Sequence, residues 1–80
     1  MATKIVMYTK NDCPNCKRAK ARFEDCPVEV ELIEKNIEAD PDAYLEFVAL
    51  GSSSAPTFKF EDGGIVAGFD EGKIMNKLGL

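Results

Sequence analysis

Residues 8–18 of the chain read YTKNDCPNCKR, with two cysteines, Cys13 and Cys16, three positions apart. The apolar run at residues 5–8 just before them is typical of a buried strand. Pro14 suits the first position of a helix, because its missing N–H would have no partner there. The stretch therefore predicts a strand, a break, and a helix capped by Cys13.

The helix predicted after Pro14 separates apolar from basic side chains. One apolar stripe along the helix consists of residues spaced three, four and three positions apart, which are Cys16, Ala19, Phe23 and Cys26. The other faces are basic and carry Lys17, Arg18, Lys20 and Arg22. We therefore expect the Cys16 thiol to be less accessible than that of Cys13.

The capping position of Cys13 favours a thiolate, because free N–H groups and the positive end of the helix dipole stabilise an anion there. Lys10 adds positive charge three residues upstream. The Cβ atoms of Cys13 and Cys16 should lie roughly 5 to 6 Å apart, so a slight adjustment would close a disulfide. An accessible and a buried thiol suit an attacking and a resolving role.

Other interpretations of the cysteine pair are half of a metal site, a structural disulfide or chance. The chain has three cysteines, no second CxxC and no histidine, so a single zinc ion would find at most three thiolates. Redox chemistry is therefore favoured over metal binding. Cys26 lies about 15 Å beyond Cys16 along a helix, too far to bond to it, and is interpreted as a core thiol.

The remaining elements follow from patterning. Residues 28–32 alternate between apolar and acidic side chains, which is typical of a strand with one face in solvent. Ile33 and Ile37 extend the apolar content of this segment. Asp40 and Pro41 begin a second helix that should end at Gly51. Its apolar side is assigned to Tyr44, Phe47 and Val48.

The last part of the chain predicts a hairpin and a helix. Residues 57–60 and 65–67 are strand-like runs around a Gly-containing turn at 61–64. Asp70 opens a final helix with an inner face of Ile74, Met75 and Leu78. The order β-α-β-α-β-β-α predicts a four-stranded mixed sheet, with a parallel pair around the first helix and an antiparallel edge, flanked by three helices.

Composition fits one small globular domain, residues 1–80, with 45% hydrophobic and 30% charged residues. An odd number of cysteines, and no signal-peptide or membrane-span pattern, lead us to expect a cytoplasmic protein. We also expect a monomer, although no pattern in the sequence specifies the oligomeric state. The net charge of −4 argues against nucleic-acid and anionic-membrane partners. The charge is uneven, because residues 1–22 hold six bases against one acid.

From Lys4 to Leu78 the chain resembles the glutaredoxin-like branch of the thioredoxin fold. The residues that carry the resemblance are YTK at 8–10, CPNC at 13–16 and RAK at 18–20. GSSSAP at 51–56 is similar to the family's Gly-x-x-Thr-Val-Pro loop, whose proline is cis and faces the CxxC.

The resemblance implies a dithiol thiol-disulfide oxidoreductase with Cys13 as nucleophile and Cys16 as resolving thiol. Its substrates would be protein disulfides, such as that of ribonucleotide reductase, or glutathione mixed disulfides. A cis Pro56 would leave the backbone of Ala55 to pair with an extended peptide or with glutathione. No cofactor is expected to bind tightly. The candidate substrate-binding residues are Lys10, Ala55, Pro56, Gly68, Phe69 and Asp70.

The source of electrons stays open between glutathione and thioredoxin reductase. Glutaredoxins usually have a tyrosine where Asn15 stands, and a basic residue or glutamine where Ser53 stands, so the grip on a glutathione carboxylate should be weaker. Asp70 and Glu71 could still bind its amine. NrdH-redoxins, which take electrons from thioredoxin reductase, carry Trp-Ser-Gly-Phe-Arg-Pro near the C-terminus, of which residues 68–69 match the Gly-Phe.

Two further alternatives remain at this point. The chain could carry an iron-sulfur cluster or a metal between two copies through Cys13, or it could be a binding module without redox activity. Residues 68–69 could also be a strand end with a core aromatic.

Overall fold

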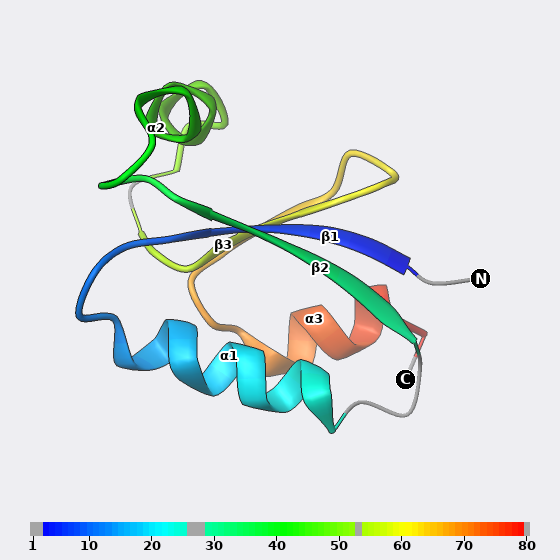
Figure 1. Cartoon of the computed structure of the whole chain (residues 1–80). Coiled ribbons are helices and arrows are strands. Elements are labelled where there is room, and N and C mark those ends of the chain that lie inside the picture. The colour runs from blue at the N-terminus through cyan, green and yellow to red at the C-terminus, as the bar shows by residue number, and fades with distance from the viewer. Residues whose placement is uncertain (1–2, 26–28, 53, 80) are drawn as a thin grey trace.

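The structure, a computed structural model, describes residues 3–25, 29–52 and 54–79. Its elements follow the order that the sequence predicts (Figure 1). They are β1 (Thr3–Thr9), α1 (Pro14–Glu24), β2 (Val30–Asn36), α2 (Pro41–Ala49), β3 (Thr57–Phe60), β4 (Ile65–Ala67) and α3 (Glu71–Lys77).

The four strands form one mixed sheet in the order β2-β1-β3-β4. β1 pairs in parallel with β2, from Thr3 opposite Val30 to Thr9 opposite Asn36. β3 is antiparallel to both β1 and β4. Figure 1 shows α1 and α3 on one face of the sheet and α2 on the other. The predicted parallel pair and antiparallel edge are confirmed.

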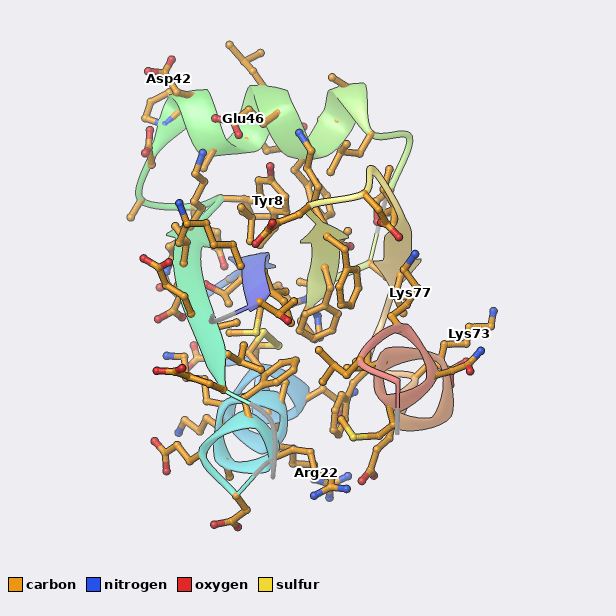
Figure 2. All side chains as sticks on the ribbon, turned by 90° about the vertical axis from the view of Figure 1, so that its right-hand side faces the viewer. Tyr8, Arg22, Asp42, Glu46, Lys73 and Lys77 are labelled. Atoms are coloured by element: carbon orange, nitrogen blue, oxygen red, sulfur yellow. A yellow bond between two sulfur atoms is a disulfide. The ribbon has the colours of Figure 1, made fainter. Side chains whose placement is uncertain are left out.

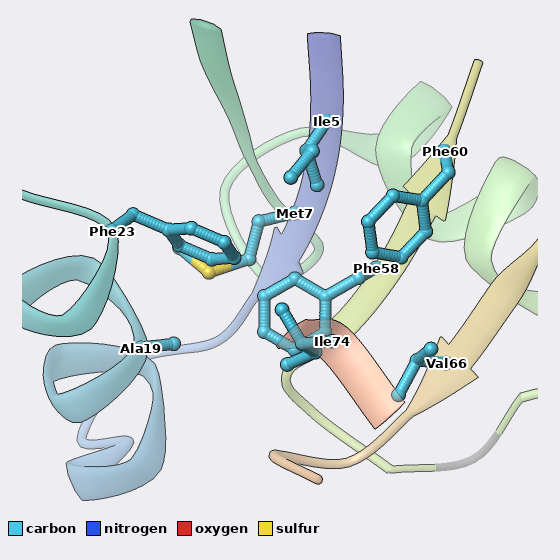
Figure 3. Packing of buried hydrophobic residues seen from close by; sticks show 8 residues of the cluster. All are labelled: Ile5, Met7, Ala19, Phe23, Phe58, Phe60, Val66 and Ile74. Carbon is cyan, nitrogen blue, oxygen red and sulfur yellow. The ribbon is translucent and has the colours of Figure 1, made fainter. Parts of the chain in front are cut away.

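The main core lies between the sheet and the helices α1 and α3. Alternate residues of β1 and β3 face this layer, since side chains along a strand alternate between faces. Phe58 packs edge-on against Phe23 of α1, with ring centroids 5.7 Å apart. The buried cluster comprises Ile5, Met7, Ala19, Phe23, Phe58, Phe60, Val66 and Ile74 (Figure 3). Met75 and Leu78 pack against it as expected, partly buried.

The helix α2 buries a different stripe from the one expected. Ala43 and Phe47 face the sheet, whereas Tyr44 and Val48 are each 51% exposed, so their assignment to the inner side was wrong. Figure 1 shows α2 at one end of the sheet, and its buried residues are Ala43 and Phe47. Tyr44 and Val48 each follow one of these buried residues by one position. They are turned by about 100° around the helix axis and therefore point away from the sheet.

The strand β2 extends to Asn36, beyond the predicted end at residue 32, because the ladder with β1 continues to Thr9. Val30 and Leu32 are half-buried while Glu31 is exposed, as the alternation predicts. Val28 and Cys26 lie outside the described residues, so the core assignment of Cys26 stays a prediction.

The turn between β3 and β4 and the end of α2 use glycine as predicted. Gly63 has φ +86° and Gly51 has φ +76°, a region that glycine adopts at little cost. The N–H of Phe60 donates to the Gly64 carbonyl at 2.9 Å, which closes the hairpin. No described helix is long and apolar enough to cross a membrane.

Candidate active site

Cys13 and Cys16 form a disulfide at the start of α1, with Cα atoms 5.3 Å apart. Cys13 is the N-cap and Pro14 follows it in the first turn, as predicted. The two residues are 6% and 4% exposed, so the expected difference in access is almost absent in this disulfide form. The bond holds the Cys13 sulfur against Cys16, which belongs to the buried stripe of the helix.

The start of α1 provides a donor to the Cys13 sulfur. The N–H of Cys16 donates to Cys13 Sγ at 3.2 Å, and the N–H of Lys17 donates to the Cys13 carbonyl at 3.3 Å. The sulfur therefore lies at the positive end of the helix dipole. Negative charge on this sulfur would be stabilised once the disulfide opens.

The loop before β3 lies beside the cysteines. The Ala55–Pro56 peptide bond is cis, as the family resemblance implied, and Pro56 is buried. Thr57 pairs with Tyr8, so Pro56 lies level with Thr9 at the end of β1 from which the chain leads to Cys13. Thr57 Oγ1 donates to the Ser54 carbonyl at 2.5 Å and contacts Ser52 Oγ at 2.6 Å, which holds the loop in shape.

Gly68 completes this end of the sheet. Its N–H donates to the Pro56 carbonyl at 2.8 Å, which extends the β3–β4 pairing by one bond. The cysteine loop, the Pro56 loop and the segment between β4 and α3 thus gather at one end of the molecule, on the left in Figure 1. The half-buried Ala55 makes no hydrogen bond to another described residue.

Phe69 and Asp70 both have structural contacts. Phe69 is partly buried against the core, as expected for a strand end with a core aromatic. Asp70 caps α3, since its Oδ1 accepts from the N–H of Lys73 at 3.1 Å, and Oδ2 lies 3.9 Å from Lys73 Nζ. Glu71 Oε1 accepts from Arg22 Nε at 2.5 Å. Both carboxylates suggested for an amine therefore have partners within the chain.

A polar network that the sequence analysis missed lies on the α2 face. Tyr8 OH donates to Glu46 Oε1 at 3.0 Å, and Lys35 Nζ donates to both Glu46 oxygens at 2.8 and 3.1 Å (Figure 2). Burial, and then the bond to Glu46, raise the pKa of Tyr8 to about 12. The bonds from Lys35 and Tyr8 lower the pKa of Glu46. The sequence signal was a single polar atom, the Tyr8 hydroxyl, in an apolar strand.

Thr9 is also unusual, because its buried hydroxyl has no hydrogen-bond partner among the described residues. Thr9 ends β1 four residues before Cys13 and alternates with Ile5 and Met7 toward the α1 face. An unpaired buried hydroxyl costs about 1 to 3 kcal/mol. Within residues 3–25, 29–52 and 54–79, no three His, Cys, Asp or Glu side chains gather to hold a metal ion.

The family model for glutaredoxin matches residues 5–62. Among solved structures, the thioredoxin-like protein BC3987 is similar with a TM-score of 0.81 and 32% identity, covering 90% of this chain and 96% of that one. A mutant of the same protein gives a TM-score of 0.83 and 31% identity, covering 92% and 97%. No curated protein matches. The architecture is thus thioredoxin-like, as predicted.

Proposed function

The chain belongs to the glutaredoxin family, and from this premise we propose that it is a dithiol reductase of protein disulfides and glutathione mixed disulfides. The family and the Cys13–Cys16 pair support the general class, a thiol-disulfide oxidoreductase. The observation that carries the proposal is the disulfide at the N-terminus of α1, where a backbone N–H donates to Cys13 Sγ.

The reaction uses both thiols in turn. In the reduced protein the Cys13 thiolate attacks one sulfur of the substrate disulfide, the S–S bond breaks, and the leaving thiolate takes a proton from water. The Cys16 thiol then gives its proton to water, its thiolate attacks Cys13 Sγ, the mixed disulfide bond breaks, and the second substrate sulfur leaves as a thiolate that takes a proton from water. The substrate gains two electrons, and the protein is left with the Cys13–Cys16 disulfide.

Substrate docking is assigned to the groups beside the disulfide. An extended peptide or glutathione would pair with the backbone of Ala55, next to the cis Pro56 and Gly68. The free hydrogen-bonding capacity of Ala55 supports this assignment. Lys10 is exposed in the loop before Cys13 and is suited to bind a carboxylate. Phe69 and Asp70 complete the candidate set.

The internal contacts of Asp70 and Glu71 favour thioredoxin reductase over glutathione as the electron donor. Each carboxylate already accepts a hydrogen bond within the chain, which reduces its capacity for the amine of glutathione. Ser53, where a cation would bind a glutathione carboxylate, lies outside the described residues. The second candidate function is therefore an NrdH-type donor to ribonucleotide reductase, acting in the cytoplasm.

The roles of the cysteines are tested with serine variants. Cys13→Ser should abolish reduction of a protein disulfide, whereas Cys16→Ser should accumulate a mixed disulfide with substrate, detected by mass spectrometry. Cys26→Ser is the control and should keep turnover. Full protein-disulfide reduction by Cys13→Ser would refute the assignment.

The electron donor is tested by reducing insulin disulfides with NADPH and one of two systems. One supplies glutathione with glutathione reductase, and the other supplies thioredoxin reductase alone. Turnover with thioredoxin reductase alone would support the NrdH-type role. Turnover only with glutathione would make the protein a conventional glutaredoxin, and turnover with neither would refute both.

A further inference from the structure

The basic side chains of α1 form two rows, because helix residues three or four apart lie on the same side. One row, Lys17 and Lys20, faces β2, where Lys20 Nζ lies 2.7 Å from Glu34 Oε1. The other row, Arg18 and Arg22, faces α3, where Arg22 binds Glu71 (Figure 2). In each row the base farther from the disulfide is paired with an acid.

The bases nearer the disulfide have no such partner. Lys17 and Arg18 directly follow Cys16, both are exposed, and neither forms an ion pair with a described acidic side chain. Lys10, on the loop before Cys13, is likewise exposed. We call Lys10, Lys17 and Arg18 the basic rim. It is a local excess of positive charge in a chain of net charge −4.

Two exposed acids, Asp12 and Glu38, offset part of the charge of the basic rim, whose three bases still outnumber them. Asp12 lies in the same loop as Lys10, and Glu38 Oε1 accepts from the N–H of Asn11 at 2.7 Å. Neither forms an ion pair with a rim residue among the described residues. The excess of positive charge therefore lies around the disulfide, in the loop that holds Lys10 and at the start of α1.

We propose that the basic rim selects protein substrates whose disulfide is flanked by acidic residues. This inference rests on the proposed function and names the substrate class of the same site. Opposite charges at the edge of a contact steer association and disfavour wrong partners, and such steering raises association rates by about tenfold or more. Exposed charges are screened by salt, so the selection should weaken as ionic strength rises.

The test compares two peptides with the same disulfide, one flanked by Glu and one by Gln. The wild-type protein should show a kcat/KM about tenfold higher for the Glu peptide at low ionic strength, and the ratio should approach one in roughly 1 M salt, where the Debye length is about 3 Å. The double variant Lys17→Gln, Arg18→Gln should lose the preference while it keeps its rate on the Gln peptide.

The matched control is Lys20→Gln, Arg22→Gln, which removes the same charge from the same helix at bases that are already paired. It should keep the preference. Equal loss of the preference for the Glu peptide in both double variants would overturn the proposal, because net charge alone would then explain the effect. Equal rates of the wild-type protein on both peptides would also overturn it and leave the proposed function intact. Reduction of neither peptide would overturn both.

Discussion

Cys13 both caps α1 and forms the disulfide, and both roles follow from its place before Pro14. Because serine is a good N-cap residue, Cys13→Ser should keep the helix start while it removes the nucleophile. A loss of turnover in that variant would therefore reflect the missing nucleophile rather than a misfolded protein. Circular dichroism can verify that the variant is folded.

The raised pKa of Tyr8 predicts that the free energy of unfolding falls in alkali. Its pKa rises from 10.0 to about 12 in the folded protein, chiefly by burial. The unfolded chain loses this proton first, so the stabilisation is complete below pH 10 and lost as the pH rises to about 12. The expected slope is roughly 1 kcal/mol per pH unit.

Urea unfolding across this range checks the effect of Tyr8. Tyr8→Phe has no proton to lose, so its free energy of unfolding should fall less steeply than that of the wild-type protein. Other groups titrate in both proteins, and the difference between the two curves isolates Tyr8. Parallel curves would contradict the assignment.

Thr9→Val should stabilise the disulfide form by about 1 kcal/mol, because the lost hydroxyl is buried and without a described partner. Thr57→Val is the matched control, since Thr57 is equally buried but its hydroxyl bonds to the Ser54 carbonyl. The melting temperature should therefore rise for Thr9→Val and fall for Thr57→Val. A destabilised Thr9→Val protein would indicate a hydrogen bond from Thr9.

At the scale of elements, the short helices depend on contacts beyond their own residues. α3 spans seven residues, too few to be stable alone. It is held by its Asp70 cap, by the buried Ile74 and by the Arg22–Glu71 ion pair with α1. α2 is held by Ala43, Phe47 and the bond from Tyr8 to Glu46.

The Asp70 cap predicts that Asp70→Ala lowers the free energy of unfolding by about 1 kcal/mol, whereas Asp70→Asn stays close to the wild-type value, because asparagine also caps helices. Denaturant unfolding of the two variants measures this. Equal losses would contradict the cap. An Asn variant that keeps stability but loses glutathione-dependent turnover would assign the carboxylate to a ligand.

At the scale of the whole molecule, the edges of the sheet disfavour pairing with another sheet, and the monomer stays a prediction. β2 is one edge and carries the exposed Glu31 and Glu34, and charged edge strands resist pairing with another sheet. β4, the other edge, has only three residues. Sedimentation should therefore give a mass near 8.8 kDa.

A matched pair of variants tests the edge. Glu31→Thr, Glu34→Thr should associate more readily than the wild-type protein, whereas Glu24→Thr, Asp25→Thr removes equal charge at the end of α1 and should not. A wild-type dimer, or equal association of both variants, would contradict this account.

The sequence by itself determined the order of elements, the cap at Cys13, the cysteine pair and the glycine turns, because each depends on residues close together in the chain. The cis form of Pro56 came from the family resemblance. Only the tertiary structure decided that Ala43 rather than Tyr44 faces the sheet, that Gly68 lies beside Pro56, and which bases of α1 are paired. These features depend on which distant residues meet, and alternation and helical spacing specify a face without naming its partner.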